Sequence, residues 1–62
     1  MKDKNGVEID IGDEVEVPEP NSTDMYNNEF VGRVSDFRND MVTVEDQDGD
    51  CWDIEPERLE VI

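Results

Sequence analysis

The stretch VTVEDQDGDCWDI, residues 42–54, predicts a β-hairpin. On both sides of an Asp-Gly pair, apolar residues alternate with polar ones, which is the pattern of two strands that each bury one face. Asp-Gly pairs are also favoured in the tight turns that join antiparallel strands. The register of the two strands decides which side chains are buried, because a shift of one residue would turn every apolar side chain outward.

The loop length fixes this register. A two-residue turn at Asp48-Gly49 would set Val44 opposite Asp53 and bury a carboxylate. A three-residue loop, residues 47–49, keeps apolar residues together and places its glycine in the left-handed position of a type I turn with a bulge. We therefore predict the three-residue loop, which assigns Trp52 to the core. The predicted pairs are Asp46 with Asp50, Val44 with Trp52, Val42 with Ile54 and, pointing outward, Glu45 with Cys51.

Two shorter strand patterns lie near the N-terminus. Residues 7–11 and 14–17 alternate Val or Ile with Asp or Glu. Gly12-Asp13 separates the two patterns, and Pro18 ends the second because proline has no N–H for a strand ladder. We expect two extended pieces that meet at a turn.

The next strand begins at Phe30 and places Phe30, Gly32 and Val34 on one face. Gly32 permits a sharp bend or the close approach of another backbone. Phe37 is out of phase with this face. Either a bulge near Asp36 rotates its side chain, or the ring packs beside the following turn, and the pattern leaves both arrangements open.

The chain closes with a tight turn and a short strand. A proline among charged residues at positions 55–58 favours a single 3₁₀ turn, after which Leu59 and Val61 resume the alternation. There is no Ala, and Val and Ile far outnumber the single Leu, which favours strands over helices. We expect an all-β fold, a small five-stranded barrel with a 3₁₀ turn before the last strand, forming one domain over residues 1–62.

Acidic residues dominate the charge. Nineteen Asp and Glu face five Lys and Arg, for a net charge of −14 at pH 7. Such charge is typical of disordered chains, but eight Val, four Ile, two Phe and one Leu, placed with a period, supply a core. Without a membrane-length apolar run or a signal-peptide pattern, we expect a cytoplasmic protein with no membrane partner. Direct nucleic-acid binding is also disfavoured, because it needs clustered Lys and Arg.

Three short motifs carry a family resemblance. IGDEV at 11–15, GRV at 32–34 and VTV at 42–44 resemble the "GD-x-V … G-x-V … V-x-V" run of KOW-type and Tudor-like SH3-like barrels. The chain is also similar to small bacterial and phage-encoded SH3-like proteins of unassigned function. The resemblance implies a five-stranded SH3-like barrel. It transfers no site residue, because the matching residues build the barrel.

The sequence also departs from these families. KOW-type domains that bind RNA are usually basic, and peptide-binding SH3 domains carry an ALYDY-type motif and a paired-Trp surface, which are missing here. Tudor domains that bind methylated Lys or Arg use a cage of several aromatic residues. This chain has four aromatic residues in all, and the core needs one or two of them.

No pattern of residues indicates catalysis or metal binding. The chain has no His, and nothing pairs a nucleophile with a base. Cys51 has no basic neighbour in sequence to activate its thiol. Residues 46–50 resemble a calcium loop, but an EF-hand numbered from Asp46 places Cys51 where glycine is required. We expect no enzymatic activity, no cofactor and no metal site.

Residues 18–29 form a long polar loop, and long ordered loops often carry binding sites. Tyr26 lies beside Met25 and between the carboxylates of Asp24 and Glu29, which suits a cationic side chain. Alternatively, Met25 and Tyr26 fold back as a lid over one end of the barrel. The candidate partner-binding residues are Asp24, Met25, Tyr26, Glu29 and Phe30.

These observations favour a non-enzymatic protein-interaction module, monomeric or weakly dimeric. We expect it to bind a basic protein or peptide through residues 18–30, with opposite charge speeding the encounter. One alternative is a nucleic-acid mimic, whose carboxylates would inhibit a DNA- or RNA-binding protein. Another is a structural subunit that pairs through an edge strand near the C-terminus. Negative charge also serves solubility alone in small proteins.

Overall fold

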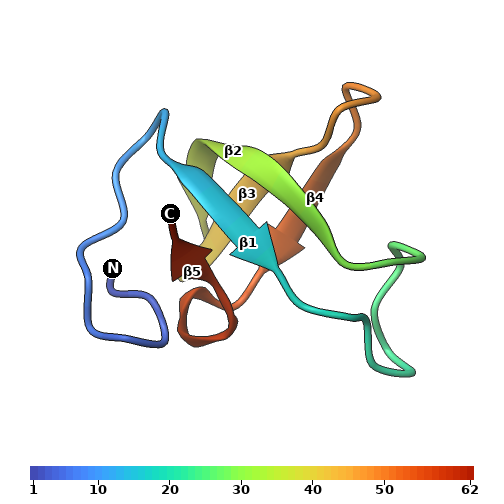
Figure 1. Ribbon diagram of the computed structural model, residues 1–62, viewed down its shortest axis with the longest axis horizontal. Helices are drawn as coiled ribbons and strands as arrows, with labels where there is room; N and C mark the ends of the chain where they lie inside the picture. Colours follow the sequence, from blue (N-terminus) through green and yellow to red (C-terminus); the bar gives the residue numbers. More distant parts are fainter.

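The computed structural model describes residues 1–62 and contains five strands and one 3₁₀ turn (Figure 1). The elements are β1 (Glu14–Val17), β2 (Phe30–Arg38), β3 (Met41–Glu45), β4 (Cys51–Ile54), the 3₁₀ turn η1 (Pro56–Arg58) and β5 (Glu60–Val61). All the strand pairs are antiparallel. The predicted all-β fold class, with a 3₁₀ turn before the last strand, is confirmed. No helix in the structure is long and apolar enough to cross a bilayer.

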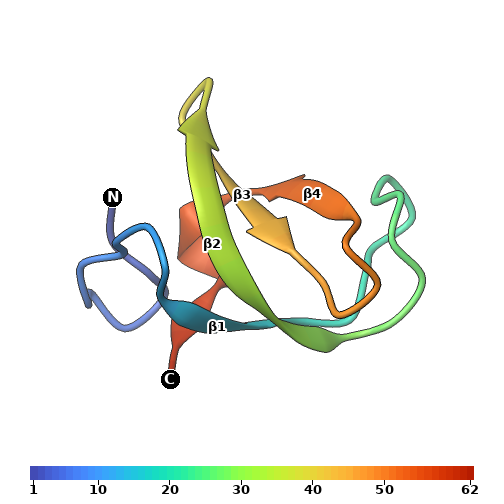
Figure 2. The ribbon, with the colours of Figure 1, turned by 90° about the horizontal axis from the view of Figure 1, so that it is seen from above.

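The sheet is rolled up without being closed. Its strand order is β4-β3-β2-β1-β5, so β4 and β5 remain as its two edges. The nine-residue β2 curves across the molecule and brings β1 on one side to face β3 and β4 on the other (Figure 2). This arrangement is consistent with a small SH3-like fold.

The hairpin of β3 and β4 has the predicted register. Val44 lies opposite Trp52 and Val42 opposite Ile54, while the outward pair is Glu45 with Cys51. The remaining predicted pair is joined by a hydrogen bond of 2.8 Å from the Asp46 N–H to the Asp50 carbonyl. Gly49 has a φ of +85°, the left-handed conformation that the three-residue loop requires.

A bulge in β2 decides the position of Phe37. Val34 pairs with Val44, but the next pair is Asp36 with Thr43, so Ser35 is an extra residue in β2. The extra residue changes the phase of the strand, and Phe37 then lies opposite Val42, half-buried against the core. The bulge, one of the two arrangements that the sequence left open, is therefore present.

The strand expected over residues 7–11 is wrong. These residues form a loop in which the only ladder contact is a single bridge between Lys2 and Glu8. Ile9 is buried, but Val7 and Ile11 remain 46% and 60% exposed. β1, the next strand along the chain, has no free side for these residues, because it pairs with β2 on one side and β5 on the other.

The core lies inside the rolled sheet, where Gly32 allows two strands to approach closely. A Cβ atom at this position would lie 2.5 Å from Cγ1 of Val44 and 2.6 Å from the carbonyl oxygen of Glu45. The predicted close approach at this glycine is confirmed. The buried apolar residues are Ile9, Val15, Val17, Tyr26, Val34, Val42, Val44, Ile54 and Leu59.

Candidate functional site

Two connections, one long and one short, lie at the same end of the molecule. The 18–29 loop joins β1 to β2 and the 46–50 turn joins β3 to β4, and both lie on the right in Figures 1 and 2. In a sheet whose successive strands run up and down, alternate connections lie at the same end, so the topology itself brings them together. The candidate site is built between these two segments.

Tyr26 anchors the 18–29 loop to the rolled sheet. Its side chain is only 6% exposed, and its hydroxyl donates a hydrogen bond of 2.9 Å to the Pro18 carbonyl. The ring meets Phe30 edge to face at a centroid distance of 5.6 Å and Trp52 at 6.2 Å. Burial raises the pKa of the Tyr26 hydroxyl above its ordinary value. Tyr26 therefore folds back over the barrel end, as the lid alternative expected, while Met25 beside it is 82% exposed.

Asp24 holds the loop to the 3₁₀ turn through Arg58. The guanidinium donates two parallel hydrogen bonds, from Nη1 to Oδ1 at 3.1 Å and from Nη2 to Oδ2 at 2.9 Å. Nη2 also donates to the Tyr26 hydroxyl at 3.1 Å. Paired planar contacts of this kind are among the stronger ones available to arginine. They hold the pKa of Asp24 below its ordinary range and raise the pKa of Arg58.

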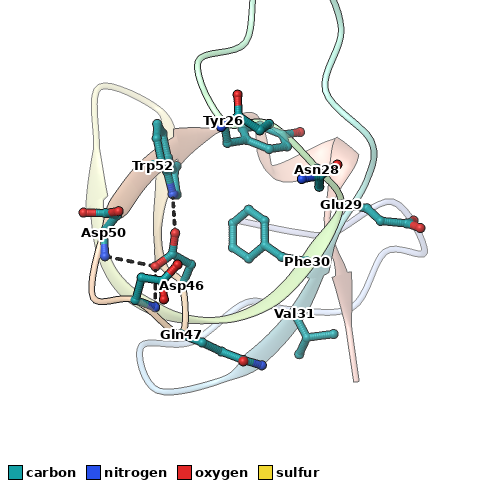
Figure 3. Close-up of a pocket in the computed structure, with 11 residues that line it drawn as sticks. Tyr26, Asn28, Glu29, Phe30, Val31, Asp46, Gln47, Asp50 and Trp52 are labelled. Carbon is teal, nitrogen blue, oxygen red and sulfur yellow. Dashed lines mark hydrogen bonds between the residues drawn. The ribbon is translucent and has the colours of Figure 1, made fainter.

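A groove of about 500 Å³ opens between the loop and the turn (Figure 3). We call it the aromatic groove because three of the four aromatic side chains of the protein, those of Tyr26, Phe30 and Trp52, line it. In Figure 3 the Phe30 ring lies below the Tyr26 ring and Trp52 lies to the left of both, and Tyr26 contacts each of the other two edge to face. The other lining residues are Asn27, Asn28, Glu29, Val31, Asp46, Gln47, Asp48 and Asp50.

Asp46 positions the tryptophan in this groove. Its Oδ2 accepts a hydrogen bond of 2.9 Å from Nε1 of Trp52, and its Oδ1 accepts the backbone N–H groups of Asp48 and Asp50 at 2.9 and 3.0 Å. The indole hydrogen bond is the main cause that lowers the pKa of Asp46. This carboxylate is thus part of the scaffold. The carboxylates of Glu29, Asp48 and Asp50 make no hydrogen bond or ion pair within the protein and face solvent.

A second groove, of about 510 Å³, lies on the other side of the contact between Tyr26 and Trp52. We call it the edge groove because it follows β4, the free edge of the sheet. Met25 and Met41 supply apolar surface in it. Its full lining is Thr23, Asp24, Met25, Tyr26, Met41, Cys51, Trp52, Asp53 and Glu55.

The predicted site residues fall into three groups. Asp24 and Tyr26 are engaged in contacts inside the protein. Glu29 and Phe30 line the aromatic groove, and Met25 lines the edge groove. The sequence prediction missed the contribution of the β3–β4 hairpin, namely Asp46, Asp48, Asp50 and Trp52.

The order of the predicted strands could have revealed this contribution. In an up-and-down antiparallel sheet, that order places the 46–50 turn and the 18–29 loop at the same end. The sequence favoured a core position for Trp52 over a binding surface, whereas the structure leaves it half-buried in the walls of both grooves.

The side chains of the site show which chemical groups it offers to a ligand. No cluster of three or more Asp, Glu or Cys side chains in the structure is arranged to hold a metal ion. The donors and acceptors that the grooves offer are carboxylates, amides and aromatic rings. No protein-family model, curated protein or solved structure matches the chain.

Proposed function

We propose that this protein is a non-enzymatic interaction module that binds a cationic segment of a partner protein in the aromatic groove. The observation that carries the proposal is the convergence of three aromatic rings and three unpaired carboxylates, from segments far apart in sequence, on one groove. Aromatic faces and carboxylates are the two groups that attract Lys and Arg side chains.

The electrostatics of the molecule support the same ligand. A net charge of −14 attracts a basic partner over the screening distance of roughly 8 Å at physiological salt, and it speeds encounter. Glu29, Asp48 and Asp50 then offer charges at the groove itself. A cation held against an aromatic face contributes about 0.5–1 kcal/mol where the site is exposed.

The resemblance to Tudor-like and KOW-type barrels agrees with a ligand of this class. Tudor domains that bind methylated Lys or Arg use several aromatic residues, and this groove gathers Tyr26, Phe30 and Trp52. Our proposal covers a cationic side chain in general, methylated or not. It does not depend on membership of either family.

Trp52 supplies the measurement, since it is the only tryptophan and lines the groove. A blocked hexa-arginine peptide titrated into the protein should change its fluorescence with saturation, and a hexaglutamate peptide should not. Replacing Glu29→Gln, Asp48→Asn and Asp50→Asn together should weaken binding roughly tenfold or more, because it removes the charges at the groove.

The matched control removes the same charge elsewhere. The substitutions Asp10→Asn, Glu16→Gln and Glu57→Gln change exposed residues outside both grooves. They should weaken binding only about twofold, through the general field. Equal weakening by the two triple variants would show that total charge alone attracts the peptide, and it would overturn the proposed site.

A further inference from the structure

The two edges of the sheet differ in how they are covered. Just before β5, the carbonyl of Leu59 accepts the Lys4 N–H at 2.9 Å, and within β5 the Val61 N–H donates to Oδ2 of Asp3 at 2.8 Å. The N-terminal segment therefore occupies the outer side of that strand. No segment of the chain pairs with the outer side of β4.

The register shows which groups β4 presents to solvent. In an antiparallel ladder, facing pairs alternate between those that exchange backbone hydrogen bonds and those that do not. Asp46 and Asp50 are a bonded pair, so Val44–Trp52 is bonded as well, and the pair Glu45–Cys51 between them is not. The N–H and C=O groups of Cys51 and of Asp53 consequently point away from β3, toward the open edge.

The side chains along this edge form two rows of different character. Cys51 and Asp53 are exposed on the outer face of the sheet, where Glu45 stands opposite Cys51. On the inner side Trp52 is half-buried, and the exposed Met25 lines the edge groove with it. A strand added here would have every second residue beside carboxylates and the others above apolar surface.

We infer that the edge of β4 takes an extended segment of the partner as a sixth, antiparallel strand, with basic residues on the outer face alternating with apolar residues over the edge groove. This inference rests on the proposed function and adds a second contact for the same partner: the segment that binds in the aromatic groove continues past Asp50 as a strand along β4. Antiparallel pairing is favoured because it is the more stable ladder and the one used throughout this sheet.

Charge selects the partner segment over a second copy of this chain. Two copies paired through β4 would bring together molecules that each carry a charge of −14, with Asp53 on both sides of the new ladder. A basic strand instead places opposite charges in directly facing positions. The same acidic edge resists self-pairing, as charged edge strands generally do.

The test uses a blocked octapeptide of alternating Lys and Val and follows it by NMR. Binding should slow hydrogen exchange at the Cys51 and Asp53 amides about tenfold or more at saturation, because both become bonded to the added strand. The Thr43 amide, on the neighbouring strand, should not change. If the peptide binds and neither edge amide is protected, the added strand is wrong while the proposed function stands. If the octapeptide does not bind although hexa-arginine does, the added strand is wrong and the proposed function stands; if neither peptide binds, both fail.

N-methylated peptides make the test independent of any variant that fails to fold. In the antiparallel arrangement the Lys residues face Cys51 and Asp53, so their own N–H groups bond to β4. Methylating the Lys backbone nitrogens should abolish protection of both amides, and methylating the Val nitrogens should leave it intact. Loss of protection with the Val series instead would mean a parallel strand, and loss with neither series would mean no ladder; both would overturn the inference.

A variant of the protein gives a second reading. Cys51→Pro removes one outward N–H without removing a bond of the sheet, since proline is tolerated where the N–H of an edge strand faces solvent. It should weaken octapeptide binding about fivefold or more, while Cys51→Ser should bind as the unaltered protein does. Unchanged binding by a folded Cys51→Pro protein would count against the added strand.

Discussion

One edge strand of this sheet is covered by the chain and the other is open to solvent. The covered edge contributes to the stability of the fold, and we assign binding to the open edge. The β5 edge is covered by the N-terminal segment, and the side chain of Leu59 next to it is fully buried. The β4 edge is bordered by a groove and keeps Cys51 exposed. Edge strands are usually covered or charged to prevent unwanted pairing, and this protein covers one and leaves the other acidic. Changes at the covered edge should therefore affect folding, and changes at the open edge should affect binding.

The largest effect is expected from Leu59→Ala at the covered edge. The substitution leaves a cavity in the core beside β5, and large-to-small changes of this kind cost about 2–5 kcal/mol of unfolding free energy. Ile62→Ala, three residues later and mostly exposed, should cost less than about 0.5 kcal/mol. Urea unfolding measured by Trp52 fluorescence compares them. Similar midpoints for the two variants would mean that this edge is not a stabilising one.

An intermediate effect is expected from Asp3→Asn. The buried Asp3 carboxylate accepts the N–H groups of Asn5 and Val7 on Oδ1 and that of Val61 on Oδ2. An amide has a single acceptor oxygen, so the N–H groups that bond to one of the two oxygens, either those of Asn5 and Val7 or that of Val61, lose their acceptor. The melting temperature should fall by several degrees, and hydrogen exchange at the Val61 amide should accelerate.

The control for this variant is Asp10→Asn, which changes an exposed carboxylate in the same N-terminal segment. It should leave both the melting temperature and the Val61 amide unchanged. Accelerated exchange at Val61 in both variants would attribute the effect to loss of charge rather than to loss of the contact.

The smallest expected effect, on both edges together, comes from pH. Backbone hydrogen bonds, that from Val61 above all, lower the pKa of Asp3, and the Trp52 and Arg58 contacts lower those of Asp46 and Asp24. A carboxylate whose folded pKa is below its unfolded value stabilises the fold above that unfolded value, near 4, and this contribution is lost as the pH falls through the folded pKa.

Urea midpoints should therefore hold or rise between pH 7 and about 5, as protonation relieves self-repulsion, and fall below about pH 4. The fall should be shallower in Asp3→Asn, because that variant has one such carboxylate fewer. A steady rise in stability down to pH 3 would contradict the role given to these three groups.

The β3–β4 hairpin could be predicted because its register depends on residues close together in the sequence. Features that depend on contacts between distant residues could not be predicted. The register of β3 and β4 follows from alternation and from the glycine that the loop requires, all within about a dozen residues. The fate of residues 7–11 depends on whether a neighbouring strand is free, which alternation alone does not show. Asp3 and Val61 are 58 residues apart, and no periodicity connects them.

The candidate site, too, could be predicted only where it depends on local sequence. The 18–29 loop was found because its composition and length are visible in the chain. Trp52 was placed on the correct face of β4, but alternation does not tell whether that face is covered at its end. The pairing of Asp24 with Arg58 joins two segments whose proximity only the rolled sheet creates.

The contact between Asp3 and Val61 also has a practical meaning for anyone who attaches this protein to something else. It ties the N-terminal segment to β5, and both chain ends lie on the left in Figure 1, away from the loop and the hairpin tip that border the grooves. A surface linker or a fluorescent label on either end would leave both grooves open. A circular permutation is also possible: a peptide linker would join the two ends, and new ends would be made at the Asn39-Asp40 turn. The N-terminal segment and β5 would then be linked covalently as well as by hydrogen bonds.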